Sequence, residues 1–97
     1  MTRAELIARL INDLPSLPPR QVEAAFQKIM DIIAQNLAEG NRVELRGFGS
    51  FGLRGHSAHE GRNPKTGAKV TVEQKKVPYF RAGKKLKKVV DQLHKDT

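Results

Sequence analysis

The chain has 97 residues, a formal charge of +8 and an apolar content of 38%, below the usual ~45–50%, so a single domain with a small core is expected. Cysteine is absent, which excludes disulfides, thiol catalysis and cysteine-based zinc sites. No apolar run is long enough to cross a membrane and the start lacks the apolar stretch of a signal peptide, so we expect a cytoplasmic protein.

The charge is distributed unevenly along the chain. Residues 1–40 hold four basic and five acidic side chains, whereas residues 41–97 hold fourteen basic and five acidic ones. A basic excess confined to one part of a chain is typical of a polyanion-binding site, and nucleic acid is the expected ligand. A basic face that serves only solubility is the alternative.

The first forty residues predict two helices. Thr2 followed by Glu5 fits a capping box, and apolar residues then recur at helical spacing over 6–14. The prolines at 15, 18 and 19 end that helix and begin another, because proline fits a first helical turn but not a helix interior.

The second helix is predicted to begin at these prolines, to carry apolar residues at helical spacing from Val22 to Leu37, and to stop at Gly40. Its apolar stripe is broad and includes Ile29, Ile32, Ile33 and Leu37. Such a stripe serves either the core of a monomer or the surface of a second chain. The low total apolar content favours a dimer.

Strands and a long hairpin are predicted in the middle of the chain. Residues 42–46 alternate polar and apolar side chains, which predicts a half-buried strand. The glycines in 47–51 allow a tight turn that directs Phe48 and Phe51 into the core. Residues 51–80 then form a hairpin with its tip at 61–67, and each side reaches about 30 Å.

Most of this hairpin is too polar to form a core. Residues 54–62 contain a single apolar residue, Ala58. The hairpin is therefore either a surface loop or an arm that becomes ordered on a polyanion. Gly52 and Gly55 near its base predict added flexibility. Pro64 at the tip is either a turn former or an apolar wedge of the kind that enters between base steps.

The last segment predicts a basic helix. Leu86, Val89, Val90 and Leu93 share one face. Lysines crowd the first turns, where they oppose the helix dipole unless an anion binds nearby. The helix therefore either contacts phosphate or is simply a soluble basic element.

The chain carries three motifs in order, Arg46-Gly-Phe-Gly-Ser-Phe51, Gly61-Arg-Asn-Pro-Lys-Thr-Gly67 and Val77-Pro-Tyr-Phe-Arg-Ala-Gly-Lys84. Together they resemble the HU and integration host factor family of bacterial DNA-bending proteins over essentially the whole chain. The first motif, with Glu44 before it, is most similar to the beta-type subunits of integration host factor. That similarity implies an alpha-type subunit as the heterodimer partner.

The resemblance implies an α+β fold and an intertwined dimer. Each subunit has a two-helix N-terminal body, an antiparallel sheet saddle, a long protruding β-hairpin arm and a C-terminal helix. Residues 1–97 would form one DNA-binding domain, with the dimerisation body at 1–40, the sheet and arm at 41–80, and the last helix at 81–97. Ala82 departs from the family, which commonly has proline there, and relaxes the turn into the last helix.

The implied function is architectural and nucleoid-associated: sharp bending of double-stranded DNA through the minor groove to assist recombination, transcription and replication complexes. Pro64 corresponds to the wedge that unstacks one base step per arm. Arg46, oriented by Glu44, corresponds to a pair linked to selectivity on one flank. The minor-groove contacts beside the wedge are Arg62, Asn63 and Lys65. The remaining DNA contacts that we expect are Arg42, Arg54, Lys69, Lys75, Lys76, Arg81, Lys84 and Lys85.

Three other functions are weighed against this one. An enzyme is disfavoured because no nucleophile–base set, carboxylate pair or metal cluster is present, and no cofactor or metal is expected. His56 and His59 are expected to be solvated or near phosphate. An RNA-binding or protein-interaction module is disfavoured because aromatic stacking platforms are lacking. A homodimer of the HU type, without sequence preference, is the nearest alternative, and Glu44 with Arg46 argues against it.

Overall fold

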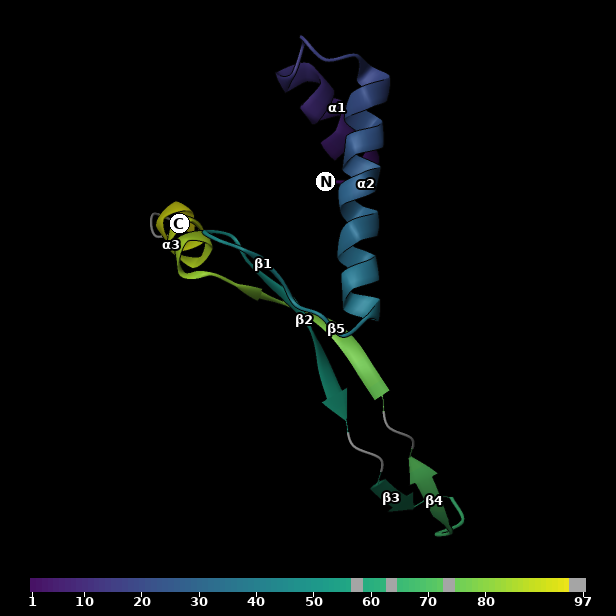
Figure 1. Cartoon of the computed structure of the whole chain (residues 1–97). Helices are drawn as coiled ribbons and strands as arrows, with labels where there is room; N and C mark the ends of the chain where they lie inside the picture. The colour runs from purple at the N-terminus through teal and green to yellow at the C-terminus, as the bar shows by residue number, and fades with distance from the viewer. Residues whose placement is uncertain (57–58, 63–64, 73–74, 95–97) are drawn as a thin grey trace. The chain divides into compact units, whose positions relative to one another are not determined.

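The computed structural model describes residues 1–56, 59–62, 65–72 and 75–94 (Figure 1). The chain divides into two compact units, Met1–Asn36 and Leu37–Thr97. Helices and antiparallel strands both occur, which confirms the predicted α+β class. Across the described residues, no helix is both long and apolar enough to cross a membrane.

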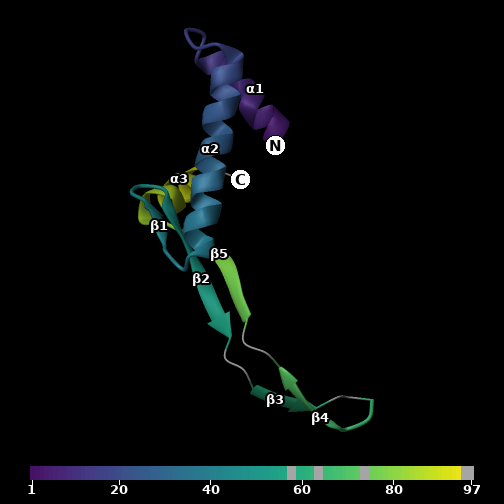
Figure 2. The same ribbon diagram turned by 45° about the vertical axis from the view of Figure 1, so that its right-hand side comes forward.

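The first unit is a pair of helices, α1 (Arg3–Asp13) and α2 (Pro19–Ala38). Thr2 caps α1, since its hydroxyl oxygen accepts the backbone N–H of Glu5 at 3.1 Å. Pro19 is the first residue of α2, where its missing N–H costs nothing. The two views place α1 beside the first part of α2 (Figure 2). The predicted helical pair and its boundary signals are therefore confirmed.

The end of α2 follows the sequence signal at Gly40. The helix stops at Ala38, and Gly40 has φ of +86° while its N–H donates to the carbonyl of Leu37 at 3.0 Å. A left-handed residue at this position turns the chain away from the helix axis, and glycine adopts it without steric cost.

Little of the apolar surface of the two helices is buried. Among the described residues, Ile7 and Val22 are the only apolar side chains classed as buried, at 7% and 4% exposed. Further along α2, Ile29 is 54% exposed and Ile32 is 48% exposed. The stripe predicted on this helix therefore exists, but much of it is not covered within the chain.

The second unit contains a three-stranded antiparallel sheet in the order β1 (Val43–Leu45), β2 (Gly49–His56) and β5 (Lys75–Ala82). A second antiparallel pair, β3 (His59–Arg62) and β4 (Lys69–Val72), continues the predicted hairpin. The last pair of this ladder is Arg62 with Lys69. The predicted tip at 61–67 lies partly outside the described residues.

The last helix, α3 (Lys84–His94), follows directly after Gly83. It begins later than the predicted boundary at 81, because β5 continues pairing through Arg81 and Ala82 with Ser50 and Gly49. Arg81 therefore lies on a strand, and its direction is set by the sheet.

The ladder between β2 and β5 gives the sheet one aromatic face. Phe51 lies opposite Phe80, and their ring centroids are 4.9 Å apart. Phe48 packs on Phe80 from the β1–β2 turn, with centroids 5.4 Å apart. The prediction that Phe48 points into a core is wrong for the single chain, since 47% of this residue stays exposed.

Two glycines of β2 allow aromatic rings to lie against its backbone. A Cβ at Gly49 would lie 2.5 Å from the carbonyl oxygen of Arg81 and 2.6 Å from the Phe80 ring. Gly52 is buried beneath the side chain of Tyr79. The sequence interpretation of Gly52 as a source of flexibility is therefore corrected: this glycine provides space for a packed ring.

Gly49→Ala is expected to lower the free energy of unfolding by about 1–3 kcal/mol, because overpacking forces the backbone or the Phe80 ring to shift. Urea denaturation at a fixed protein concentration measures this change. Gly55→Ala is the matched control, because a Cβ there meets nothing within 4 Å, and its effect should stay within about 1 kcal/mol. Equal losses in the two variants would contradict the steric explanation.

Candidate nucleic-acid interface

The sheet has a basic face opposite its aromatic face. Side chains directly opposite each other in an antiparallel ladder lie on the same side. Ser50 pairs with both Glu44 and Arg81, Gly52 pairs with Tyr79, and Arg54 pairs with Val77. We use the term basic face for the side of the sheet that carries Arg42, Glu44, Ser50, Arg54, Tyr79 and Arg81.

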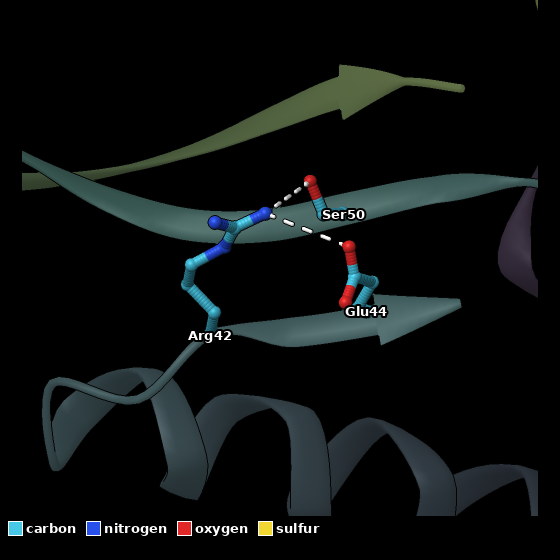
Figure 3. Close-up of polar contacts among 3 residues, drawn as sticks. All are labelled: Arg42, Glu44 and Ser50. Carbon is cyan, nitrogen blue, oxygen red and sulfur yellow. Dashed lines mark hydrogen bonds and ion pairs between the residues drawn. The ribbon is translucent and has the colours of Figure 1, made fainter. Parts of the chain in front are cut away.

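A small polar network orders one part of the basic face (Figure 3). The Nη2 atom of Arg42 lies 3.8 Å from Oε1 of Glu44 and donates to the hydroxyl of Ser50 at 3.5 Å. Ser50 is buried, whereas the side chains of Arg42 and Glu44 are 64% and 76% exposed. The network therefore anchors an accessible arginine to a fixed point of β2.

The observed partner of Glu44 corrects one expectation. Glu44 forms its ion pair with Arg42, not with Arg46, which the resemblance had implied. The reason is the position of the two arginines. Glu44 lies on β1 opposite Ser50, and the side chain of Arg42, which lies just before β1, also reaches Ser50. Arg46 lies beyond the end of β1, in the turn that leads to β2.

A concavity of about 680 Å³ lies next to this network. Its lining joins the β1–β2 turn, the end of β5 and the start of α3. The basic side chains that line it are Arg42, Arg46, Arg81, Lys84 and Lys87, and its acidic side chain is Glu44. The rest of the lining consists of Leu45, Gly47, Gly49, Ser50, Ala82 and Gly83. A concentration of cations at a helix N-terminus favours a phosphate-bearing ligand.

The sequence identified most of these residues but missed two. Arg42, Glu44, Arg46, Arg81 and Lys84 were all expected, and the fold brings them together at one concavity. Lys87 was one of the lysines that crowd the first turns of the predicted helix but was not chosen as a DNA contact, although its spacing of three from Lys84 puts both on one side of a helix. Ser50 was missed because no local pattern shows that a serine will be buried beside an arginine.

A second hollow of about 540 Å³ lies further along β2 and β5 and is lined by Leu53, Arg54, Gly55, Tyr79, Phe80 and Arg81. The guanidinium carbon of Arg54 lies over the Tyr79 ring, 5.0 Å from its centroid. Arg81 lines both hollows, so the basic surface continues from the start of α3 to the base of the arm.

The remaining expected contacts are spread along the arm and α3. Lys75 and Lys76 are exposed at the start of β5, and exposed Lys69 lies on β4 opposite Arg62 of β3. Lys65 is exposed in the connection that follows β3. Lys85 lies on α3 with its Cδ near Gly47 and does not line the concavity. Asn63 and Pro64 lie outside the described residues.

The comparison with known families decides what kind of protein carries this surface. A family model described as "Bacterial DNA-binding protein" matches residues 1–91. The chain belongs to this family. Membership confirms the resemblance seen in the three motifs, and it confirms that the chain is a DNA-binding protein and not an enzyme.

Individual relatives match the chain over nearly its whole length. Integration host factor subunit beta of Nitrosomonas eutropha is 46% identical over 95 residues, covering 98% of this chain and 90% of the relative. The same subunit of Idiomarina loihiensis is 50% identical over 93 residues, covering 96% and 99%.

Solved structures of the family show the same fold. The structure described as an Anabaena HU–DNA cocrystal matches with a TM-score of 0.76 and 36% identity, covering 93% of this chain and 97% of that chain. A mutant HU from Thermotoga maritima matches with a TM-score of 0.67 and 29% identity, covering 93% and 99%.

Within this family member, the Arg42–Glu44 pair is expected to tune affinity for DNA more than stability. Glu44→Gln removes the one carboxylate among the residues lining the concavity, which should raise the affinity for random-sequence duplex at low salt about 2- to 5-fold. The free energy of unfolding should change by less than about 1 kcal/mol, because the pair is exposed. Fluorescence anisotropy and urea denaturation measure the two quantities.

The matched control is Asp13→Asn, which makes the same charge change in the exposed Arg9–Asp13 pair, where the two atoms are also 3.8 Å apart. Asp13 lies on α1 and is not among the residues that line the concavity. An equal gain in affinity for both variants would show that net charge, and not the position of Glu44, determines the effect.

Proposed function

We propose that this chain is an architectural DNA-bending protein that acts as the beta-type subunit of a heterodimer. The proposal rests chiefly on the concavity in which five cations meet one carboxylate at the start of α3. The β2–β5 ladder leads from this concavity to the paired, polar strands of the arm. The similarity to integration host factor beta subunits and to an HU–DNA cocrystal structure supports the same conclusion.

The proposed dimer follows from the uncovered apolar side chains. Large apolar residues of α2, the sheet and α3 remain 40–54% exposed in the chain, and they include Ile29, Met30, Ile32, Phe48, Phe80 and Val89. A chain with so little buried apolar surface gains stability by covering these residues with a second subunit. An alpha-type subunit is the proposed partner, and residues 1–97 are proposed to act as one functional domain.

We assign the tip of the arm to the minor groove. Pro64 is the proposed wedge, and Arg62, Asn63 and Lys65 are the proposed contacts beside it. Unstacking costs a few kcal/mol per base step, a magnitude established for this class of minor-groove protein, and smooth bending of a short site costs about 1–6 kcal/mol more. Cations along the flanks must offset these costs, so affinity should fall steeply as salt rises.

The flanking phosphates are assigned to the basic surface of the second unit. The proposed contacts are Arg42, Arg54, Lys69, Lys75, Lys76, Arg81, Lys84, Lys85 and the newly identified Lys87. Arg46, next to Glu44 in the same concavity, is the proposed determinant of site preference. Most of the remaining specificity arises from DNA deformability and groove width, because the minor groove carries a degenerate code.

The proposed setting is the bacterial nucleoid. There a bent DNA segment brings distant sites together in recombination, transcription and replication complexes. Minor-groove architectural proteins act in this way, by shaping DNA and not by chemical catalysis.

Energy transfer between the two ends of a labelled duplex of about 35 bp tests the function directly, because bending by a large angle brings the ends together. The chain is titrated alone and then with an alpha-type partner. We expect high transfer only with the partner and only on some sequences. Equal transfer on every duplex with the chain alone would establish a non-specific homodimer. Absence of transfer in both titrations would overturn the bending function.

Pro64→Ala is expected to reduce the bend angle more than the affinity, because the wedge acts on the base step while the cations hold the flanks. Energy transfer at saturating protein measures the bend, and anisotropy measures the affinity. Pro78→Ala, a change of the same chemical type on β5, is the control and should leave the bend unchanged. Equal bend angles for the wild type and Pro64→Ala would remove the wedge from the mechanism.

A further inference from the structure

The ring of Tyr79 lies against the backbone of β2 at a point where a Cβ would crowd it. Tyr79 and Gly52 are directly paired in the ladder. A Cβ at position 52 would lie 3.0 Å from Oη and 3.1 Å from both Cε1 and Cζ of Tyr79. The ring therefore covers Gly52 closely, and its position is set by the strand beneath it.

This ring holds a cation on the basic face. The guanidinium carbon of Arg54 lies 5.0 Å from the centroid of the Tyr79 ring, within the range of a cation–π contact. An arginine placed over an aromatic ring loses little further side-chain freedom when it binds an oxyanion, and it still presents several N–H donors. In the part of the chain that the structure describes, no carboxylate forms an ion pair with Arg54.

The position of Arg54 links the two parts of the basic surface. Arg54 and Arg81 line the same hollow of about 540 Å³, and Arg81 also lines the larger concavity at the start of α3. Arg54 is exposed on β2, two residues before the strand ends at His56. It is therefore the cation of this surface that lies nearest to the base of the arm on β2.

We propose that Tyr79 is a positioning residue for DNA binding, which acts by holding Arg54 toward a phosphate beside the arm. This inference rests on the proposed function, because it assigns the ligand of the hollow as a DNA phosphate. It adds Tyr79, which carries no charge, to the residues that determine affinity. A purely structural Tyr79 would alter stability without altering how the affinity depends on Arg54.

A double-mutant cycle with salt titration tests the proposal, with the protein in the dimer that bends DNA. The probe is the duplex of about 35 bp used to test bending, titrated between about 50 and 200 mM salt. Arg54→Ala should reduce the magnitude of the slope of log K against log salt by about 0.9, the value for one phosphate. Tyr79→Leu should weaken binding about 2- to 5-fold when Arg54 is present and should have no further effect in the Arg54→Ala background.

Conservative variants separate positioning from packing. Tyr79→Phe keeps the ring and should restore the affinity lost in Tyr79→Leu. Arg54→Lys keeps the charge but not the planar group, so it should retain the salt slope and lose affinity. It leaves the ring in place, and it therefore tests the proposal even where Tyr79→Leu fails to fold. Arg9→Ala, on α1, removes a cation outside the basic face and should leave the slope unchanged.

Two results would overturn the inference while leaving the proposed function intact. The first is an equal loss of affinity from Tyr79→Leu with and without Arg54. The second is an unchanged salt slope in Arg54→Ala. By contrast, a wild-type dimer that shows no salt-dependent binding to the duplex would overturn the proposed function itself.

Discussion

The pairing register of β2 with β5 is the constraint on which the rest of the second unit depends. It places Phe51 opposite Phe80 on one side of the sheet, and Ser50 opposite Arg81 on the other. Because side chains alternate along a strand, a shift of one residue would exchange the two faces. The same register that lets aromatic side chains pack together therefore collects the arginines on one basic face, which is the proposed DNA-binding surface.

Glycines stabilise this register by letting rings approach the backbone. Phe80 covers Gly49 and Tyr79 covers Gly52, so neighbouring aromatics of β5 lie over alternate faces of β2. Rings packed over strand glycines are a known means of fixing register in a sheet. Here they also make the base of the arm a defined structure, which gives Arg54 and Arg81 fixed positions. The contacts that pack the sheet thus also position the arginines of the proposed DNA-binding surface.

The balance between core and surface in this chain agrees with an architectural role. Few apolar side chains of the described residues are buried, whereas Ile29, Phe48 and Phe80 remain about half exposed. In the proposed dimer these groups stabilise the assembly, and the basic face remains available for DNA. The Arg42–Glu44–Ser50 network then has a clear physical effect. It holds Arg42 against β2 and lowers the positive charge of the concavity. In the proposed complex, binding would then depend on DNA shape as well as on charge.

The sequence alone determined the helices, the hairpin and the ligand class, because each depends on local signals. Thr2, Pro19 and Gly40 mark helix ends by their own backbone chemistry, and the basic excess after residue 40 is a property of composition. Other features required the tertiary structure. The pairing of Glu44 with Arg42, the burial of Ser50, the exposure of Phe48 and the contact of Tyr79 with Gly52 and Arg54 all depend on which residues the strand register brings together. That register joins residues up to 33 positions apart, as in the pairing of Gly49 with Ala82, and no local pattern in the sequence specifies it.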